Sequence, residues 1–249
     1  MTLRRALLGL RTWRRTRRVA RYEAIHGNSY AYRGVTVTAP NWVSVDLKNA
    51  LIKDKYESEE SGFVAAHLPD NIDVIELGGS IGVVSAFTRS RMAKDAKQIV
   101  VEAHPALAQV CATNIAPQDP YGNSKVVHGA VSYANSCEVR FSEGRNQHGG
   151  KIGTGGERSL IVPTVRLEQL CEDGEISDFA LICDIEGAEI ELFAKSDIWK
   201  THCRMIVLET HPDIYASGQT HQSELLARIK AAGFDLLDSA GSVFAFAKA

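Results

Sequence analysis

Several features of membrane, fibrous and disulfide-stabilised proteins are missing from this 249-residue sequence. No window approaches the about 18 uninterrupted apolar residues of a membrane-spanning helix, and no fixed-period repeat of a solenoid is present. The five cysteines are widely spaced and never form a C-x-x-C pair, which argues against a disulfide framework or a structural zinc site. With 45% hydrophobic and 23% charged residues, the chain has the composition of a globular protein that can bury a core.

Acidic residues are absent from residues 1–21, which contain eight arginines. The rest of the chain carries 20 basic against 30 acidic residues, so this arm and the body have opposite charge. Leu3, Leu7 and Leu10 recur at helical spacing and Trp13 follows one turn later, as in helices that lie on a membrane surface. We therefore predict a basic arm that contacts an anionic membrane surface, on a cytoplasmic protein that is peripheral at the inner membrane; a solvated helix or disordered arm is the alternative.

From Asn71 onward, short apolar runs alternate with helical stretches, the pattern of βαβ units in a parallel sheet. The runs are nearly continuous in apolar residues, which indicates strands covered on both faces. We predict strands at Ile72–Leu77, Gln98–Glu102, Lys125–Val131, Phe179–Asp184 and Arg204–Glu209, followed by a terminal hairpin of Phe234–Asp238 and Val243–Ala247. The predicted fold is α/β: a doubly wound, Rossmann-like sheet of seven strands, the last one antiparallel, formed by residues 71–249.

Residues 22–70 are predicted to form an N-terminal cap segment ahead of this domain. Tyr30–Thr38 alternates apolar and polar residues like a strand, and Lys48–His67 has a helical pattern. Between the third and fourth strands of the sheet, Val131–Phe141 is expected to form a small hairpin.

The sequence Glu76-Leu77-Gly78-Gly79-Ser80-Ile81-Gly82 stands where the first buried strand turns into a helix. Glycines there let the backbone approach a ligand, and the free amides of a helix start attract polar groups. The dinucleotide motif G-x-G-x-x-G requires glycine at positions 80 and 83, and the P-loop requires a terminal G-K-[S/T], so neither motif is present. The acid-x-G-x-x-x-G pattern that remains is similar to the first motif of class I S-adenosylmethionine-dependent methyltransferases.

Glu102 ends the second predicted strand, 24 residues after Gly78. An acid at that position can accept hydrogen bonds from both ribose hydroxyls of a nucleoside-bearing cofactor. Gly129 and Ala130, at the end of the third strand, would then lie beside the adenine. The predicted S-adenosylmethionine-binding residues are Glu76, Gly78, Gly79, Ser80, Gly82, Glu102, Gly129, Ala130 and Asp184.

Four segments of the chain resemble one known family. They are IDVIELGGSIGVVSAF (72–87), VVEAHPALAQVCATN (100–114), LICDIEGAEIEL (181–192) and IVLETHP (206–212). Together they resemble the FkbM family of methyltransferases, of which the D-x-E-G-x-E block is the most specific part. The resemblance implies S-adenosylmethionine-dependent O-methylation of a hydroxyl on a sugar, a glycolipid or a polyketide-like small molecule. Glu76 stands where the family usually has Asp, and Gly79-Ser80 replaces a more usual Ala-Asn.

Asp184 and Glu186 follow the fourth predicted strand, and Glu209 and His211 follow the fifth. Because ligands of open α/β sheets bind beyond the carboxyl ends of the strands, we expect all four to line one acceptor pocket. His211 is the best candidate for a general base, since an imidazole titrates near neutral pH, with Asp184 and Glu209 as its catalytic neighbours. Alternatively, Asp184, Glu186 and Glu209 hold Mg²⁺ or Mn²⁺, which acidifies the acceptor hydroxyl. The sequence leaves both mechanisms open.

Two further segments border the expected pocket. Residues 144–156 contain six glycines, and because loops of this length inside a domain are often lids or binding segments, we expect them to cover the acceptor. Glu189 and Glu191 lie in the opening turns of the helix after Asp184, where we expect solvated side chains that compensate the helix dipole.

Three other classes of function are weighed against a small-molecule O-methyltransferase. An RNA-directed methyltransferase is favoured by the arginine arm, but the D-I-E-G block differs from the N-P-P-Y type that holds a flipped base, so nucleic acid is not the expected partner. A membrane-associated, non-catalytic binding module explains the arm but not the retained acids, and a nucleotide-dependent oxidoreductase lacks the dinucleotide spacing. The expected partner is a small molecule or glycan with a free hydroxyl.

Overall fold

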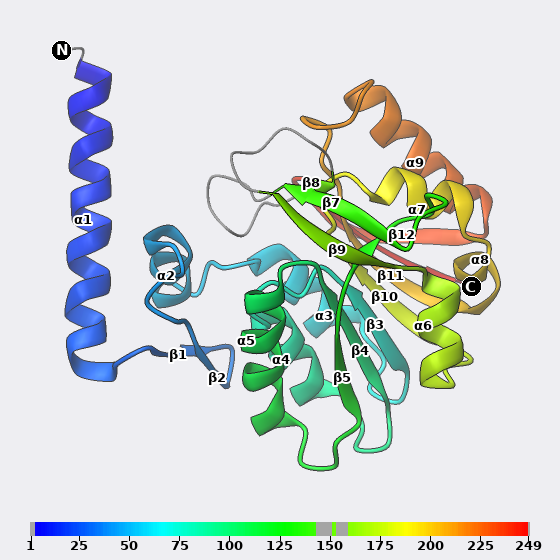
Figure 1. The fold of residues 1–249 in the computed structure, drawn as a ribbon, viewed down its shortest axis with the longest axis horizontal. Coiled ribbons are helices and arrows are strands. Elements are labelled where there is room, and N and C mark those ends of the chain that lie inside the picture. The colour runs from blue at the N-terminus through cyan, green and yellow to red at the C-terminus, as the bar shows by residue number, and fades with distance from the viewer. Residues whose placement is uncertain (1–2, 143–150, 153–158, 249) are drawn as a thin grey trace.

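The structure is a computed structural model that describes residues 3–142, 151–152 and 159–248. Within these residues, seven strands form one sheet in the order β12-β13-β11-β10-β3-β4-β5 (Figure 1). The strands are β3 (Asp73–Leu77), β4 (Gln98–Glu102), β5 (Ser124–His128), β10 (Phe179–Cys183), β11 (Cys203–Glu209), β12 (Phe234–Ala240) and β13 (Val243–Lys248). β13 runs antiparallel to both of its neighbours, whereas β11, β10, β3, β4 and β5 are parallel. The predicted α/β sheet with an antiparallel last strand is confirmed.

Helices cover both faces of this sheet, because successive side chains of each strand point to opposite sides. Val74 and Ile182 lie in a core shared with the first group of helices, and Ile75 and Leu181 lie in a core shared with the second. The first group is α3 (Ser58–His67), α4 (Val83–Arg91) and α5 (Pro105–Ile115), which a short 3₁₀ turn, η1 (Ala116–Gln118), extends. The second group is α6 (Leu167–Gly174), α7 (Glu189–Lys195), α8 (Ile198–His202) and α9 (Gln219–Ala231).

A smaller sheet, in the order β6-β9-β7-β8, follows β5 along the chain. Its strands are β6 (Ala130–Val131), β7 (Glu138–Ser142), β8 (Lys151–Ile152) and β9 (Ser159–Val165). The predicted strand Lys125–Val131 is therefore divided at Gly129. The hairpin expected at Val131–Phe141 is wrong, because β6 and β7 both pair with β9, which offers β7 a longer ladder than the two residues of β6. Apart from β8, the expected cover at residues 144–156 lies outside the described residues.

The N-terminal segment consists of α1 (Leu3–His26), β1 (Ser29–Tyr32), β2 (Val35–Thr38) and α2 (Val45–Ile52). The single strand predicted at Tyr30–Thr38 is a hairpin, because Arg33 and Gly34 both have positive φ and close a tight turn. The hairpin's buried side chains belong to the same core as α4. No helix within the described ranges is both long and apolar enough to cross a bilayer.

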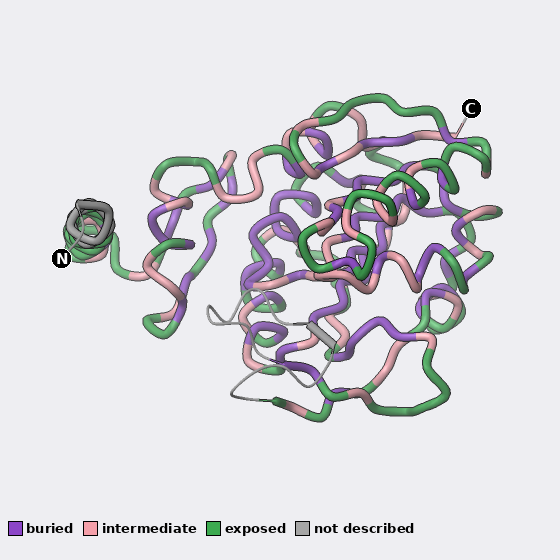
Figure 2. Tube along the Cα trace, turned by 90° about the horizontal axis from the view of Figure 1, so that it is seen from above, coloured by how far each residue is buried: buried purple, intermediate pink, exposed green. Residues whose placement is uncertain are grey.

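Helix α1 stands apart from the sheet, and α2 lies between them (Figures 1 and 2). Helix α1 continues to His26, past residue 21, where the predicted arm ends. Its second half is fixed to α2 by an ion pair between Glu23 and the buried Lys48 (2.7 Å) and by a hydrogen bond from Arg18 to Asn49 (2.7 Å). The first half therefore projects from an anchored base.

Candidate active site

The glycine turn between β3 and α4 is closely packed against backbone. A Cβ at Gly78 would lie 1.8 Å from the carbonyl oxygen of Asp184, and Gly78 has a φ of +97°. A Cβ at Gly82 would lie 2.8 Å from Cα of Cys111, and Gly82 has a φ of +78°. Both positions require glycine for the fold itself, because L residues avoid such φ values and the added atom has no room. Gly78 thereby places the turn directly against the end of β10.

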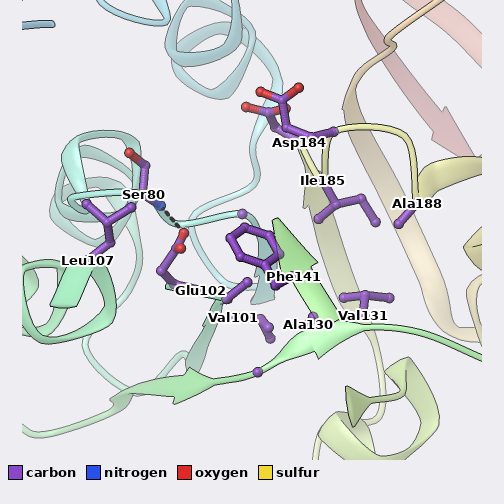
Figure 3. Close-up of a pocket in the computed structure, with 14 residues that line it drawn as sticks. Ser80, Val101, Glu102, Leu107, Ala130, Val131, Phe141, Asp184, Ile185 and Ala188 are labelled. Atoms are coloured by element: carbon purple, nitrogen blue, oxygen red, sulfur yellow. Dashed lines mark hydrogen bonds between the residues drawn. The ribbon is translucent and has the colours of Figure 1, made fainter. Parts of the chain in front are cut away.

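Glu102 joins the end of β4 to this turn. Its Oε2 accepts a hydrogen bond from the backbone N–H of Ser80 (Figure 3), and its Oε1 accepts one from the backbone N–H of His104, both at 2.7 Å. Burial raises the pKa of Glu102 to about 7, although the two backbone hydrogen bonds act in the opposite direction. Each carboxylate oxygen retains a lone pair for a ligand hydroxyl.

A cavity lies beside Glu102 (Figure 3). Its empty volume is about 630 Å³, which includes solvent space at its open mouth. The predicted site residues that line it are Gly78, Ser80, Glu102, Gly129, Ala130, Asp184 and Glu186. Its apolar walls include Val101, Leu107, Val131 and Phe141, and Phe141 comes from β7 of the smaller sheet. An apolar slot beside a strand-end carboxylate suits a nucleoside, with the base against the walls and the ribose at the acid.

Gly82, which was predicted to bind the cofactor, does not line the cavity. Glu76 and Gly79, which were also predicted to bind it, lie behind the turn and do not line the cavity either. Glu76 is 2% exposed, and its Oε1 accepts a hydrogen bond from the Ser85 hydroxyl (2.6 Å). Burial raises the pKa of Glu76 to about 8. A Cβ at Gly79 would lie 2.4 Å from Cγ1 of Val100. Both residues therefore support the turn from below.

Three of the four predicted acceptor residues meet beyond the carboxyl ends of β10 and β11. His211 Nε2 lies 3.2 Å from Asp184 Oδ1 and 3.7 Å from Glu186 Oε2. Asp184 and Glu186 also line the cavity, so the cluster borders the nucleoside slot. Glu209 ends β11 and accepts a hydrogen bond from the Ser242 hydroxyl (3.0 Å). Burial and the charge of Asp184 raise the pKa of Glu209.

Glu189, the last acid of the D-x-E-G-x-E block, is a site residue for which the sequence predicts only a solvated role. It is fully buried, so the expected solvated role is wrong. Its Oε1 lies 2.9 Å from His211 Nδ1, and its Oε2 accepts a hydrogen bond from the Tyr215 hydroxyl (3.2 Å). Burial alone would lower the pKa of His211, but Asp184 and Glu189 outweigh burial and raise it to about 11. The imidazole of the unliganded protein therefore carries a proton near neutral pH.

The start of α3 contributes further carboxyl groups from the predicted cap segment. Burial and the charge of Asp184 raise the pKa of Glu57 to about 8, and they raise that of Glu60, which is 4% exposed, well above its ordinary value. The Tyr56 hydroxyl donates to Ser80 Oγ (3.3 Å) and so links α3 to the glycine turn. No sequence motif predicts that these residues belong to the site, because they come close to Asp184 and the glycine turn only through the packing of α3 on the sheet.

A doubly wound sheet of this strand order, with a glycine turn and a strand-end acid beside an open cavity, is the arrangement of a class I S-adenosylmethionine-dependent methyltransferase. Residues 76–236 match the family model of the methyltransferase FkbM domain. The chain therefore belongs to the FkbM methyltransferase family and catalyses S-adenosylmethionine-dependent methylation.

Solved structures with a similar fold include two methyltransferases of low sequence identity. One is a methyltransferase from Pyrococcus furiosus, at 12% identity and a TM-score of 0.47, with 94% of this chain and 98% of that chain covered. The other is precorrin-6y C5,15-methyltransferase from Geobacter metallireducens GS-15, at 11% identity and a TM-score of 0.47, with 88% and 94% covered. No curated protein matches the sequence.

Proposed function

We propose that the protein transfers a methyl group from S-adenosylmethionine to a hydroxyl of a sugar, a glycolipid or a polyketide-like small molecule. The observation that carries this proposal is the contact between the cluster of Asp184, Glu186 and His211 and the nucleoside slot, since two of its members line the same cavity as Glu102. An alcohol is a poor nucleophile until its proton leaves, so a hydroxyl acceptor requires basic or cation-binding groups at this position.

The cofactor side of the cavity fits S-adenosylmethionine. Glu102 is positioned to accept the ribose hydroxyls, and the walls around Leu107 and Phe141 exclude water from the base. Asp184, close to the glycine turn, supplies a negative charge for the cationic end of the cofactor. When bound, S-adenosylmethionine supplies an electrophilic methyl group on a positively charged sulfur.

The acceptor side is suited to handling a proton. Burial, together with the charge of Asp184, raises the pKa of Glu57 to about 8 and that of Glu186 to about 7, although His211 lowers the latter. Carboxylates with such values are stronger bases than usual and can accept a hydroxyl proton near neutral pH. The general-base role predicted for His211 stays a prediction, since its own pKa of about 11 keeps it protonated until other positive charge enters the site.

A transfer assay with methyl-labelled S-adenosylmethionine tests this function. Purified protein is offered sugars, glycolipids, macrolide-like alcohols, amines and RNA, and the linkage in the product is read by nuclear magnetic resonance. We expect label only on oxygen of an alcohol, with no transfer by a Glu102→Ala variant and full transfer by Glu191→Ala, which alters α7 outside the cavity and the cluster. Label confined to RNA or to nitrogen would overturn the proposal.

We also propose that α1 brings the enzyme to an anionic membrane surface, where a lipid-linked acceptor is within reach. Four arginines on the described part of α1 are exposed and form no ion pair with the described chain: Arg11, Arg14, Arg17 and Arg21. Trp13 among them is 52% exposed. Each arginine near an anionic surface contributes about 1 kcal/mol, so four act together as a reversible anchor.

Cosedimentation with liposomes tests the role of α1. We expect full-length protein to pellet with phosphatidylglycerol-containing vesicles at low salt and to be released at high salt. A variant with alanine at the four arginines should stay in solution. A control with the same loss of charge on the body carries alanine at Lys53, Lys195, Arg228 and Lys230. Equal pelleting of the two variants would contradict the proposal.

A further inference from the structure

The cluster of Asp184, Glu186 and His211 has the dimensions of a metal site. One ligand atom from each residue can be chosen so that all three lie within 4.8 Å of one another. The distances from His211 Nε2 are 3.2 Å to Asp184 Oδ1 and 3.7 Å to Glu186 Oε2. Adjacent ligands of an octahedral ion with bonds of about 2.1 Å are about 3 Å apart, so small side-chain movements are enough to admit one.

The imidazole is oriented in the way that metal ligands usually are. Its Nδ1 lies 2.9 Å from Oε1 of the fully buried Glu189, which also accepts the backbone N–H of Ile185 (3.2 Å). The Tyr215 hydroxyl holds the second oxygen of Glu189. Because a carboxylate fixed on one ring nitrogen orients the other toward a metal, Glu189 has the position of an outer-shell partner.

Two carboxyl groups of this region, the partly exposed Asp184 and the buried Glu60, lack hydrogen-bond partners among the described residues. Asp184 Oδ1 receives no well-aligned hydrogen bond from any described residue, and its contact with His211 is an ion pair by distance only. Glu60 is 4% exposed and forms no hydrogen bond or ion pair within the described ranges, and Asp184 is the charge that affects it most. A buried carboxyl without a partner is costly, so a cationic ligand would supply what the protein omits.

We infer that Asp184, Glu186 and His211 bind a divalent cation, which displaces the proton of His211 Nε2 to solvent and whose open positions hold oxygen atoms of the acceptor. This inference rests on the proposed function for the identity of the acceptor, but the cation site itself does not. Carboxylate ligands favour Mg²⁺ and Mn²⁺, and the imidazole favours Mn²⁺ of the two. Glu209, which the sequence places in the ligand set, is replaced by His211, because Glu209 faces Ser242. A neighbouring pair of hydroxyls is the acceptor chemistry that such an ion selects.

Binding of Mn²⁺ alone, measured by the loss of the free Mn²⁺ signal in electron paramagnetic resonance, tests the site without cofactor or acceptor. We expect one ion per chain. Asp184→Asn and His211→Gln should each weaken binding by about 100-fold or more, and Glu189→Gln by about 10-fold, the range for an outer-shell partner. Glu191→Gln, two residues along the same helix, should bind as the unaltered protein does.

Melting temperature and binding of S-adenosylhomocysteine show whether each variant is folded. Asp184 also borders the cofactor, so His211→Gln is the decisive variant if Asp184→Asn binds S-adenosylhomocysteine poorly. No depletion of free Mn²⁺ by the unaltered protein, or equal affinity in folded His211→Gln, would overturn the inference.

Activity after treatment with EDTA separates this inference from the proposed function. If Mn²⁺ or Mg²⁺ restores methylation of an alcohol that EDTA abolishes, both stand. If alcohols are methylated at full rate in EDTA, the cation role falls while the proposed function remains, and proton removal passes to the side chains alone. If Mn²⁺ binds through His211 but no alcohol is methylated under any condition, the proposed function falls and the cation site remains.

Discussion

The cofactor side and the acceptor side of the cavity are built from different kinds of interaction. On the cofactor side, backbone N–H groups satisfy the carboxylate of Glu102, and glycines pack the turn against neighbouring backbone. On the acceptor side, the carboxyl groups of Asp184, Glu186 and Glu189 surround the imidazole of His211, and Glu57 lies within the field of Asp184. One side is complete without a ligand, and the other gathers more negative charge than the protein balances.

This difference has a physical consequence. Backbone packing depends on glycine at fixed places, so the cofactor side tolerates little change in shape. The acceptor side is defined by charge, and its carboxyl groups raise one another's pKa values. Substitutions on the first side should therefore act on folding and cofactor affinity together, and those on the second should act on ion binding and turnover.

The largest expected effect comes from the contact that joins the two sides. Gly78→Ala should lower the free energy of unfolding by roughly 3 kcal/mol or more, because the new Cβ combines a positive φ with a clash against the Asp184 carbonyl. Denaturant unfolding and titration with S-adenosylhomocysteine measure the loss of stability and of cofactor binding.

Gly122→Ala is the matched control for this change. Gly122 also has a positive φ, +74°, but nothing lies within 4 Å of its added Cβ. The Gly122→Ala variant should lose about 1–2 kcal/mol of unfolding free energy, the cost of an unfavourable backbone conformation, and should keep its affinity for S-adenosylhomocysteine. Equal losses in the two variants would mean that the contact with β10 does not constrain the turn.

A smaller effect is expected from the carboxylate of the cofactor side. Glu102→Ala should weaken binding of S-adenosylhomocysteine by roughly 1.5 to 3 kcal/mol, or about 10- to 100-fold, because a charged hydrogen-bond acceptor is lost. Isothermal titration calorimetry provides the affinity. The acceptor-side variant His211→Gln, by contrast, should keep it, and unaltered affinity in a folded Glu102→Ala protein would remove the assigned role of Glu102.

The sequence predicts the cofactor side better than the acceptor side because of how each is encoded. The strands, the glycine turn and Glu102 follow from local patterns within 30 residues, and the sheet topology brings them together. Glu57 and Glu60 reach the site only through the packing of α3, which no local pattern reveals. Glu189 lies in the first turn of α7, where solvated acids are common, and its partners His211 and Tyr215 reach it only because the segment after β11 packs against α7.

The effect that depends on pH concerns Glu76, the buried acid behind the cofactor side. Its pKa in the folded protein is about 8, against an ordinary value of 4.5, so the folded state binds more protons than the unfolded state between these values. Stability from this group is complete below about pH 4.5 and is lost as the pH rises toward 8. Glu76→Gln keeps an acceptor for Ser85 and has no proton to lose. The variant should match the unaltered protein near pH 5 and become more stable than it as the pH rises to 8, by up to about 1.4 kcal/mol per pH unit, as measured by denaturant unfolding.

The acceptor side provides the contrast for this pH test. Glu57 also has a pKa of about 8, but the charge of Asp184 contributes to it in addition to burial. Added Mn²⁺ should therefore reduce the loss of stability with pH that Glu57 causes more than that of Glu76, because the charge of Asp184 is the largest contribution after burial at Glu57, whereas at Glu76 it ranks behind burial and two hydrogen bonds. The difference in the free energy of unfolding between Glu76→Gln and the unaltered protein could instead stay constant from pH 5 to about pH 8. Glu76 would then be ionised at a lower pH than its burial implies. The cofactor side would then share the electrostatic character of the acceptor side, and the distinction between backbone packing and unbalanced charge would not hold.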